Sequence, residues 1–428
     1  MRARGTTTRP TAWGLCAAAL TAALAAPEAA AAPPDRPPAG ERPVRTPTAT
    51  GTDARFRGLA AVDRRTAWAA GTRGTVLRTT DGGRRWRDVS PPGAVREGLE
   101  LRGIEAFDDR RAVALSIGEG EASRVFRTDD GGATWAESFR NTDPRACYDC
   151  LAIFDSRHGL AVSDPVDRRF RVLSTGDGGR SRRVLPDAGM PQAQDGEAAF
   201  AASGQCLVTS GARDVWQATG GGATARVLHS ADRGGLTWTA SAPTVPAGDP
   251  ARGVFGPAFR DRRHGIAVGG DYRADRPSPH AAAVTGDAGR GRRRSAAPPP
   301  RYRSGVARLP HSTSRALALG PTGTDLTRDG GRTWRTVDTG SYDTVDCAPD
   351  GGCWAAGENG RVARAGKQRR PRARDRGARG GACPGRRRRP GRPEGRRRPL
   401  LGACPGRATA TARGTGRVAR RSWSRRTR

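Results

Sequence analysis

One eight-residue pattern constrains the fold of this chain more than any other feature. The pattern is Ser/Thr-x-Asp-x-Gly-x-x-Trp, and we call its copies the octets. Intact copies occupy residues 79–86, 128–135 and 327–334, and the copy at 230–238 carries one extra residue. Two further copies, at 175–182 and 285–292, have Arg182 and Arg292 in the place of Trp. The pattern is therefore a repeat that runs along most of the chain.

The residue types of the octets are those of a hairpin turn. Asp followed by Gly favours a tight turn because glycine adopts positive φ without steric cost. The Asp carboxylate can accept nearby backbone N–H groups, and the Trp gives the following strand a large apolar face. We therefore expect structural roles, not catalytic ones, at these positions. They are Asp81, Trp86, Asp130, Trp135, Asp177, Asp232, Trp238, Asp287, Asp329 and Trp334.

The spacing of the octets indicates a repeating four-stranded unit. Successive Asp positions are 49, 47, 55, 55 and 42 residues apart. A pair of short apolar strands precedes each octet, beginning near residues 58, 103, 151, 200, 256 and 305, and a seventh pair begins near 342. A period of about 40–50 residues with four short strands per unit is typical of a β-propeller. The sequence thus predicts an all-β, seven-bladed β-propeller.

The octets are similar to Asp-boxes, also called BNR repeats. Together with the Gly-x-Ala-Val-Gly strands beside them, the array resembles the photosystem II assembly factor family, the Ycf48/Hcf136-like proteins, over residues 42 to 364. This resemblance implies a seven-bladed propeller that binds other proteins. Its bacterial exported members are often labelled oxidoreductases. Asp-boxes also occur in sialidases, sortilin-type receptors and xyloglucanases, so the repeat specifies the fold better than the function.

The ends of the chain differ from its middle. Residues 1–32 have a basic start and a short apolar run, which is typical of a secretory signal, so we expect an extracytoplasmic location. Residues 33–50 are Pro-rich and predict a linker, and residues 51–364 would form the propeller. The last strand pair has no octet after it. We therefore expect residues 46–55 to supply the missing strand and close the ring.

Residues 365–428 are dominated by arginine. They carry 23 basic residues against Asp375 and Glu394, in a chain whose formal net charge is +33. Such a composition predicts a disordered segment. Three interpretations remain open: an arm for nucleic acid or another polyanion, an ordinary disordered tail, or translation past a frameshift. The third is suggested by the single lysine of the chain, Lys367, which indicates very GC-rich coding DNA.

Two cysteine pairs stand out within the repeats. Cys347 and Cys353 flank a Pro-Asp-Gly-Gly turn, and Cys147 and Cys150 are three positions apart, with Cys206 left over. A C-x2-C pair can be half of a zinc site, but no second pair follows at the usual spacing. In an exported chain, disulfides are expected before metal binding. We expect no cofactor and no metal.

Sequence signatures of common enzymes are absent. The chain has no Gly-x-Ser-x-Gly, no Gly-x-Gly-x-x-Gly after a strand, and no lysine between residues 1 and 366. His158 and His264 lie in matching Arg-His-Gly turns, which indicates a structural role. The residues of a sialidase site cannot be assembled. We therefore expect a non-enzymatic protein; glycoside hydrolysis would require two carboxylates flanking one cleft.

Propeller geometry nevertheless predicts which face could bind a partner. Turns between the first and second strands, and the octets, lie on one face; the loops after the second and fourth strands lie on the other. Acidic residues gather in these latter loops and form a candidate binding face, namely Glu119, Asp164, Asp271 and Glu358.

The sequence therefore predicts a monomeric, exported scaffold that binds another extracytoplasmic protein. A carbohydrate-binding or glycoside-hydrolase propeller is the first alternative. Polyanion or nucleic-acid binding through the basic tail is the second.

Overall fold

The computed structural model describes residues 47–365, apart from 234, 274–276 and 292. The expected signal and nearly all of the linker lie outside the described residues, as do Arg292 and the tail beyond Ala365. All the described residues belong to one compact unit.

The described residues form seven antiparallel sheets, six of four strands and one of three. We number these blades 1 to 7 in chain order. Blades 1 to 3 contain β1 (Phe56–Ala61), β2 (Ala67–Gly71), β3 (Val76–Thr79), β4 (Arg87–Asp88), β5 (Glu100–Ala106), β6 (Ala112–Ile117), β7 (Arg124–Thr128), β8 (Ala136–Arg140), β9 (Tyr148–Ile153), β10 (Gly159–Val166), β11 (Arg169–Thr175) and β12 (Arg183–Val184).

Blades 4 to 7 continue the same order. They contain β13 (Leu207–Ser210), β14 (Asp214–Ala218), β15 (Val227–Ser230), β16 (Thr239–Ser241), β17 (Arg252–Phe259), β18 (Gly265–Asp271), β19 (Ala282–Thr285), β20 (Arg293–Arg294), β21 (Gly305–Arg308), β22 (Ala316–Gly320), β23 (Gly323–Thr327), β24 (Arg335–Asp338), β25 (Thr344–Cys347), β26 (Cys353–Ala356) and β27 (Val362–Ala365). One short helix, α1 (Pro92–Arg96), lies between blades 1 and 2. No helix in the described part of the chain is long and apolar enough to cross a membrane.

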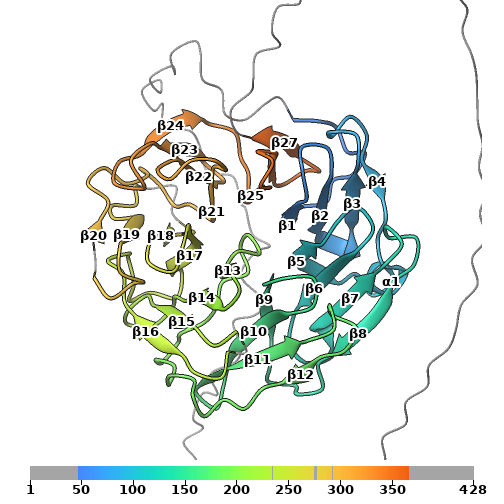
Figure 1. Cartoon of the computed structure of the whole chain (residues 1–428), viewed down its shortest axis with the longest axis horizontal. Coiled ribbons are helices and arrows are strands. Elements are labelled where there is room, and N and C mark those ends of the chain that lie inside the picture. Colours follow the sequence, from blue (N-terminus) through green and yellow to red (C-terminus); the bar gives the residue numbers. More distant parts are fainter. Residues whose placement is uncertain (1–46, 234, 274–276, 292, 366–428) are drawn as a thin grey trace, which may run out of the picture. The chain divides into compact units, whose positions relative to one another are not determined.

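The blades are arranged around a central axis, with the first strand of each innermost (Figure 1). Apolar clusters join neighbouring blades around the ring. One, for example, packs Trp354 of β26 against Leu59 and Ala69 of blade 1. Another packs Ile266 of β18 against Val306 and Ala318 of blade 6. Burial of these faces between sheets is the main stabilising contribution in such an architecture. The fold is a seven-bladed β-propeller, as the sequence predicts.

The segment before β1 supplies the strand that blade 7 lacks. Thr48 N donates to Val362 O of β27 at 2.8 Å, and Gly360 N donates to Ala54 O at 2.8 Å. The hydroxyl of Thr50 donates to Gly360 O at 2.6 Å. Residues near the start of the propeller thus pair with its last strand. The predicted closure by the N-terminal strand is confirmed, and it covers an otherwise open sheet edge.

The octets form the turn between the third and fourth strands of blades 1 to 6. In blade 1, Asp81 Oδ1 accepts the N–H groups of Arg84 at 2.9 Å and Arg85 at 3.1 Å. In blade 6, Asp329 Oδ1 accepts the N–H of Thr333 at 2.9 Å. These hydrogen bonds lower the pKa of the carboxyl groups; in blade 2 the pKa of Asp130 falls to about 2, through its bonds to Thr134. The carboxylates are engaged in closing the turns.

The Trp side chains of the octets pack between blades. Trp86 contacts Trp354 of blade 7, and Trp135 contacts Trp68 of blade 1, each edge-on to its partner. The second glycine of the turn allows this approach. Gly83 has φ of +81°, and a Cβ there would lie 2.8 Å from the Trp354 ring. An octet therefore fixes both its own hairpin and the contact with the preceding blade.

The first strand of blade 4 begins later than the sequence suggests. A strand starting near residue 200 is expected, but β13 starts at Leu207. Residues 199–206 instead leave the sheet and run across the axis of the propeller. We call this segment the axial plug.

Candidate functional site

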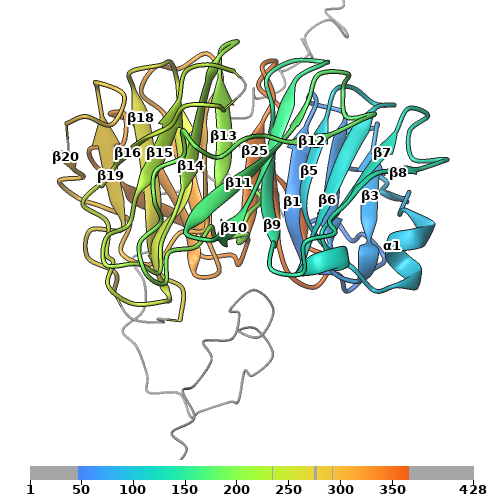
Figure 2. The same cartoon turned by 90° about the horizontal axis from the view of Figure 1, so that it is seen from below.

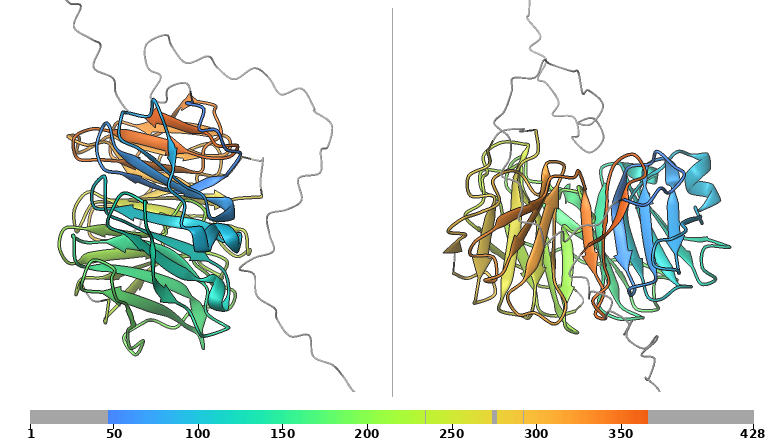
Figure 3. Two further views of the ribbon diagram at one scale, coloured as in Figure 1. Left: turned by 90° about the vertical axis from the view of Figure 1, so that its right-hand side faces the viewer. Right: turned by 90° about the horizontal axis from the view of Figure 1, so that it is seen from above.

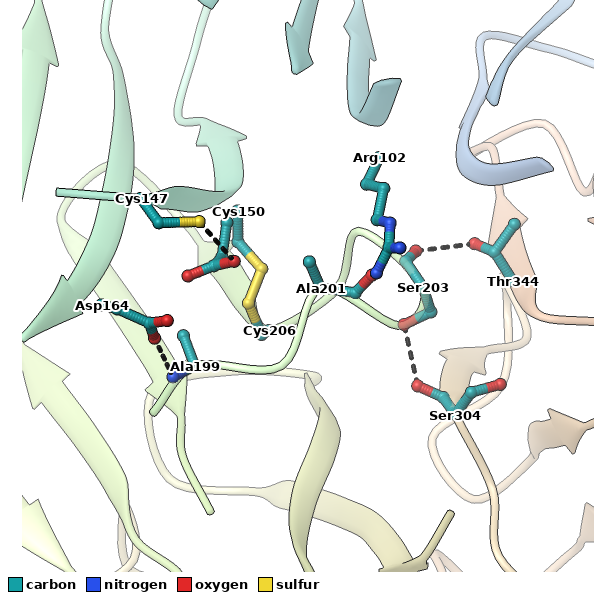
Figure 4. The surroundings of a disulfide bond; sticks show 11 residues. Arg102, Cys147, Cys150, Asp164, Ala199, Ala201, Ser203, Cys206, Ser304 and Thr344 are labelled. Carbon is teal, nitrogen blue, oxygen red and sulfur yellow. Dashed lines mark hydrogen bonds between the residues drawn. A yellow bond between two sulfur atoms is a disulfide. The ribbon is translucent and has the colours of Figure 1, made fainter. Parts of the chain in front are cut away.

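The axial plug contacts blades on all sides of the channel. Ser203 Oγ donates to Ser304 O of blade 6 at 2.8 Å, and Thr344 Oγ1 of blade 7 donates to Ser203 O at 2.9 Å. Arg102 of blade 2 donates to Ala201 O at 3.3 Å, and Ala199 N donates to Asp164 of blade 3 at 2.8 Å (Figure 4). The plug therefore divides the central channel into two separate cavities.

Two local features place the plug at this depth. Gly204 has φ of +69°, and a Cβ at this position would lie 2.7 Å from Arg102 O, so only glycine fits the crossing point. A disulfide joins Cys206 to Cys150 of β9 (Figure 4). The plug is thus tied covalently to blade 3.

The disulfides differ in part from those expected. Cys347 and Cys353 are bonded, with an S–S distance of 2.01 Å, across the turn between β25 and β26. Cys150 bonds Cys206 and not Cys147, so the bond between Cys147 and Cys150 that the sequence allows does not form. The cause is the plug, which returns Cys206 to blade 3 from 56 residues further along the chain.

On one side of the plug lies a cavity of about 180 Å³, which we call the axial pocket. Its walls come from the starts of first strands and the ends of second strands, so it opens on the face opposite the octets. The side view in Figure 2 and the second view in Figure 3 show the strand ends that define these two faces. The side chains that characterise the axial pocket are Arg55, Arg57, Arg102, Asp149, Asp164, Phe200, Phe255 and Tyr302.

Three arginines form one wall of the axial pocket. Arg55 makes two hydrogen bonds of 2.7 Å to the carboxylate of Asp343, which neutralises it. Arg57 is only 6% exposed and makes no ion pair with any residue that the structure describes; its Nε is buried without a hydrogen-bond partner. Burial and the neighbouring Arg102 lower the pKa of Arg57 to about 10. The guanidinium therefore stays charged at neutral pH.

A pair of carboxyl groups from blade 3 lies beside these arginines. Burial and the adjacent Asp164 raise the pKa of Asp149 well above its usual range. Burial likewise raises the pKa of Asp164 to about 6, against the hydrogen bond from Ala199 N. Because the two carboxyls hydrogen-bond to each other, they share one proton near neutral pH. Cys147 Sγ lies beside this pair, 3.7 Å from Asp149 Oδ1.

The opposite wall is aromatic. Phe200 of the plug stacks on Phe255 of β17, with ring centroids 4.3 Å apart. Tyr302 meets Phe255 edge-on, with centroids 4.7 Å apart. Phe255 and Tyr302 are almost fully buried, so the half-buried Phe200 is the ring of this wall that offers apolar surface to a ligand. The axial pocket therefore combines buried cations on one side with an apolar platform on the other.

The second cavity, which we call the octet-side cavity, lies beyond the plug and has a volume of about 340 Å³. Glu105 and Asp346 line it. Burial, with a contribution from Asp346, raises the pKa of Glu105 to about 8. Burial raises the pKa of Asp346 to about 6, although Ala61 N and Cys347 N each donate to its carboxylate at 2.8 Å.

The four acidic residues of the expected binding face do not form one site. Only Asp164 lines the axial pocket. Asp271 pairs with Arg252 at 3.1 Å and with Arg273 at 3.6 Å, while Glu119 is exposed and Glu358 is half-buried, each on another loop. His158 and His264 each face an Asp three residues earlier at about 3 Å, within the turn. Loop position placed Asp164 on the correct face, but it could not distinguish pocket residues from ion-paired ones.

The arrangement suits recognition better than glycoside hydrolysis. Two carboxyls that cleave a glycosidic bond stand on opposite sides of the substrate. Asp149 and Asp164 instead hydrogen-bond to each other, so no substrate fits between them. Asp271, another carboxylate of the candidate binding face, does not line the axial pocket. What the pocket can do directly is hold an anion against Arg57.

The comparisons with known proteins agree with the fold. The sequence matches no known family profile and no curated protein. Among solved structures, it is similar to Ycf48 from Cyanidioschyzon merolae, with a TM-score of 0.55 and 14% identity over 75% of this chain and 98% of that one. It is also similar to Ycf48 bound to a D1 peptide, with a TM-score of 0.51 and 12% identity over 77% and 98%.

A propeller of a different repeat class is equally similar. The WD40 repeats of RRP9 give a TM-score of 0.52 and 13% identity over 76% of this chain and 99% of that one. At these identities the likeness concerns the fold alone. The chain is thus similar in architecture to repeat proteins of more than one class.

Proposed function

We propose that this protein is a non-enzymatic, exported scaffold that binds a segment of another extracytoplasmic protein at the axial pocket. The observation that carries the proposal is the axial pocket itself, a cavity of about 180 Å³ floored by a tethered plug. A buried cation and an aromatic wall face into it. A structure with a similar fold was solved with a D1 peptide bound, which supports peptide binding by such a propeller.

The rigidity of the site supports the same proposal. The plug is held by hydrogen bonds to four blades and by one disulfide. A preformed pocket loses little conformational entropy when a partner segment binds. Its small volume fits one or two side chains or the end of a segment, so we expect the rest of the partner to lie on the surrounding loops.

Site-specific photo-cross-linking tests the proposal. A photoreactive amino acid replaces Ala198, which lines the axial pocket, in the full chain expressed in its source cells. The matched control carries the same group at Arg84, exposed on the octet of blade 1. We expect one protein to be cross-linked from position 198 and not from position 84. Equal labelling from both positions, or labelling from neither, would refute the proposal.

A further inference from the structure

The positive charge of Arg57 is buried without an ion-pair partner among the described residues. Its side chain is almost fully buried, and its Nε has no hydrogen-bond partner. Transfer of a charge from water to such a site is strongly unfavourable unless a counter-ion or several hydrogen bonds replace the water. The guanidinium of arginine does not lose its proton under ordinary conditions, so the buried charge persists. The open side of this guanidinium is the axial pocket.

The other charges around the axial pocket leave this cation uncompensated. Arg55 and Asp343 neutralise each other through two short hydrogen bonds. Arg102 donates one hydrogen bond to a backbone carbonyl, and the nearest carboxylate, that of Glu100, is half-exposed and 4.0 Å away. Asp149 and Asp164 share a proton and so contribute one negative charge. Arg57 is therefore the arginine of this wall that has no ion pair among the described residues, and a ligand with a single negative charge would supply one.

The geometry of the guanidinium and the apolar wall of the axial pocket restrict the class of ligand further. A carboxylate accepts two parallel hydrogen bonds from a guanidinium, whereas a phosphate dianion would place a second charge near Asp164 and Asp343. The stacked Phe200 and Phe255 rings cover the other side of the cavity. A ligand that satisfies both walls has a carboxylate at one end and an apolar or aromatic body.

We infer that the axial pocket is a receptor site for a monoanionic carboxylate with an apolar body, held by Arg57 and packed against Phe200, which Phe255 supports from behind. This inference rests on the proposed function, in which the pocket receives a protein segment. It names the group of that segment that is recognised: a carboxylate next to an apolar side chain. A free aromatic acid would present the same chemistry.

Calorimetric titration of the full chain tests the inference. The probe is N-acetyl-phenylalanine, and its amide serves as the neutral control of the same shape. The buffer contains about 0.15 M salt, so that the many exposed arginines are screened. We expect the acid to bind at one site and the amide to bind at least about tenfold more weakly, because a charge-assisted bidentate contact is lost. Equal binding of acid and amide would overturn the inference without any variant.

Variants locate the site. Arg57→Gln should weaken binding of the acid at least about tenfold and leave binding of the amide unchanged, since only the acid uses the charge. Arg84→Gln, on the exposed octet, is the matched control and should bind as the unmodified chain does. If Arg57→Gln and Arg84→Gln, both folded by circular dichroism, bind the acid equally well, the inference is wrong.

A peptide ending in phenylalanine, with a free or an amidated terminus, separates the two sources of the carboxylate. Binding of the free-terminus peptide alone supports both the inference and the proposed function. Binding of the small acid without any peptide binding supports the receptor site and contradicts the proposed function. Protein cross-linking from position 198 that persists in Arg57→Gln supports the proposed function and contradicts the carboxylate inference.

Discussion

The two cavities of the channel differ in how their ionisable side chains respond to burial. In the octet-side cavity, Glu105 and Asp346 are half-buried carboxyls whose pKa values rise to about 8 and about 6. Glu105 can therefore remain protonated at neutral pH and needs no partner. In the axial pocket, Arg57 is more fully buried, at 6% exposed, and its guanidinium keeps its proton. Only an anion from outside can compensate it, and this difference makes the axial pocket the better candidate for ligand binding.

The plug separates the two cavities, so loss of its disulfide tether should have the largest effect on stability. Cys206→Ala removes a disulfide that spans 56 residues, and the chain-entropy relation gives a loss of about 4 kcal/mol in the free energy of unfolding. Removal of the Cys347–Cys353 disulfide, which spans 6 residues, is the matched control and should cost about 2 kcal/mol. Denaturant unfolding measures both. Equal losses would show that the plug is not held by its tether.

Arg182, an arginine outside the channel, provides a contrast with Arg57. Arg182 occupies the Trp position of the blade 3 octet; its Nε and Nη1 are buried without partners, and burial lowers its pKa to about 10. Because it packs between blades and lines neither cavity of the channel, we expect Arg182→Trp to raise the free energy of unfolding by roughly 2 kcal/mol. Carboxylate binding should not change. A stability loss in thermal unfolding would show that the arginine, not Trp, fits this interface.

The pH dependence of stability tests the other cavity. The pKa of Glu105 rises from 4.5 to about 8 on folding, so the folded chain holds a proton that the unfolded chain releases. The free energy of unfolding should fall as pH rises from about 4.5 to about 8, by about 1.4 kcal/mol for each unit of the pKa shift that persists. Glu105→Gln should lack this fall and be the more stable protein at pH about 9.

Exposed Glu121→Gln is the control for this measurement. Its stability should follow that of the unmodified chain at every pH. If Glu105→Gln also follows the unmodified chain, Glu105 is not protonated in the folded state and the contrast between the cavities fails.

The sequence predicts the architecture because the fold-determining signal is local and repeated. Asp81 and its counterparts mark each turn within a few residues, and their spacing counts the blades. The alternating direction of successive strands identifies the two faces of the propeller, and so places Asp164 on the face opposite the octets. The closure by residues 46–55 follows from counting strands.

The site itself is not local in this sense. Arg57 is one of 75 basic residues, and its seclusion depends on a segment about 145 residues later that turns across the axis. Residues 199–206 contain no repeat and no turn pattern that would distinguish a plug from a first strand. The pairing of Cys150 with Cys206 was missed for the same reason, since only the crossing brings them together.

The stability of Arg57→Met shows whether Arg57 is held in the fold as an uncompensated cation. Methionine fills a similar volume without charge, so it removes the uncompensated cation and retains packing. We predict that Arg57→Met, without ligand, has a free energy of unfolding roughly 1 kcal/mol higher than the unmodified chain, and no longer binds the carboxylate probe. A less stable Arg57→Met would show that Arg57 supports the fold, and would contradict a cation held in place for a ligand.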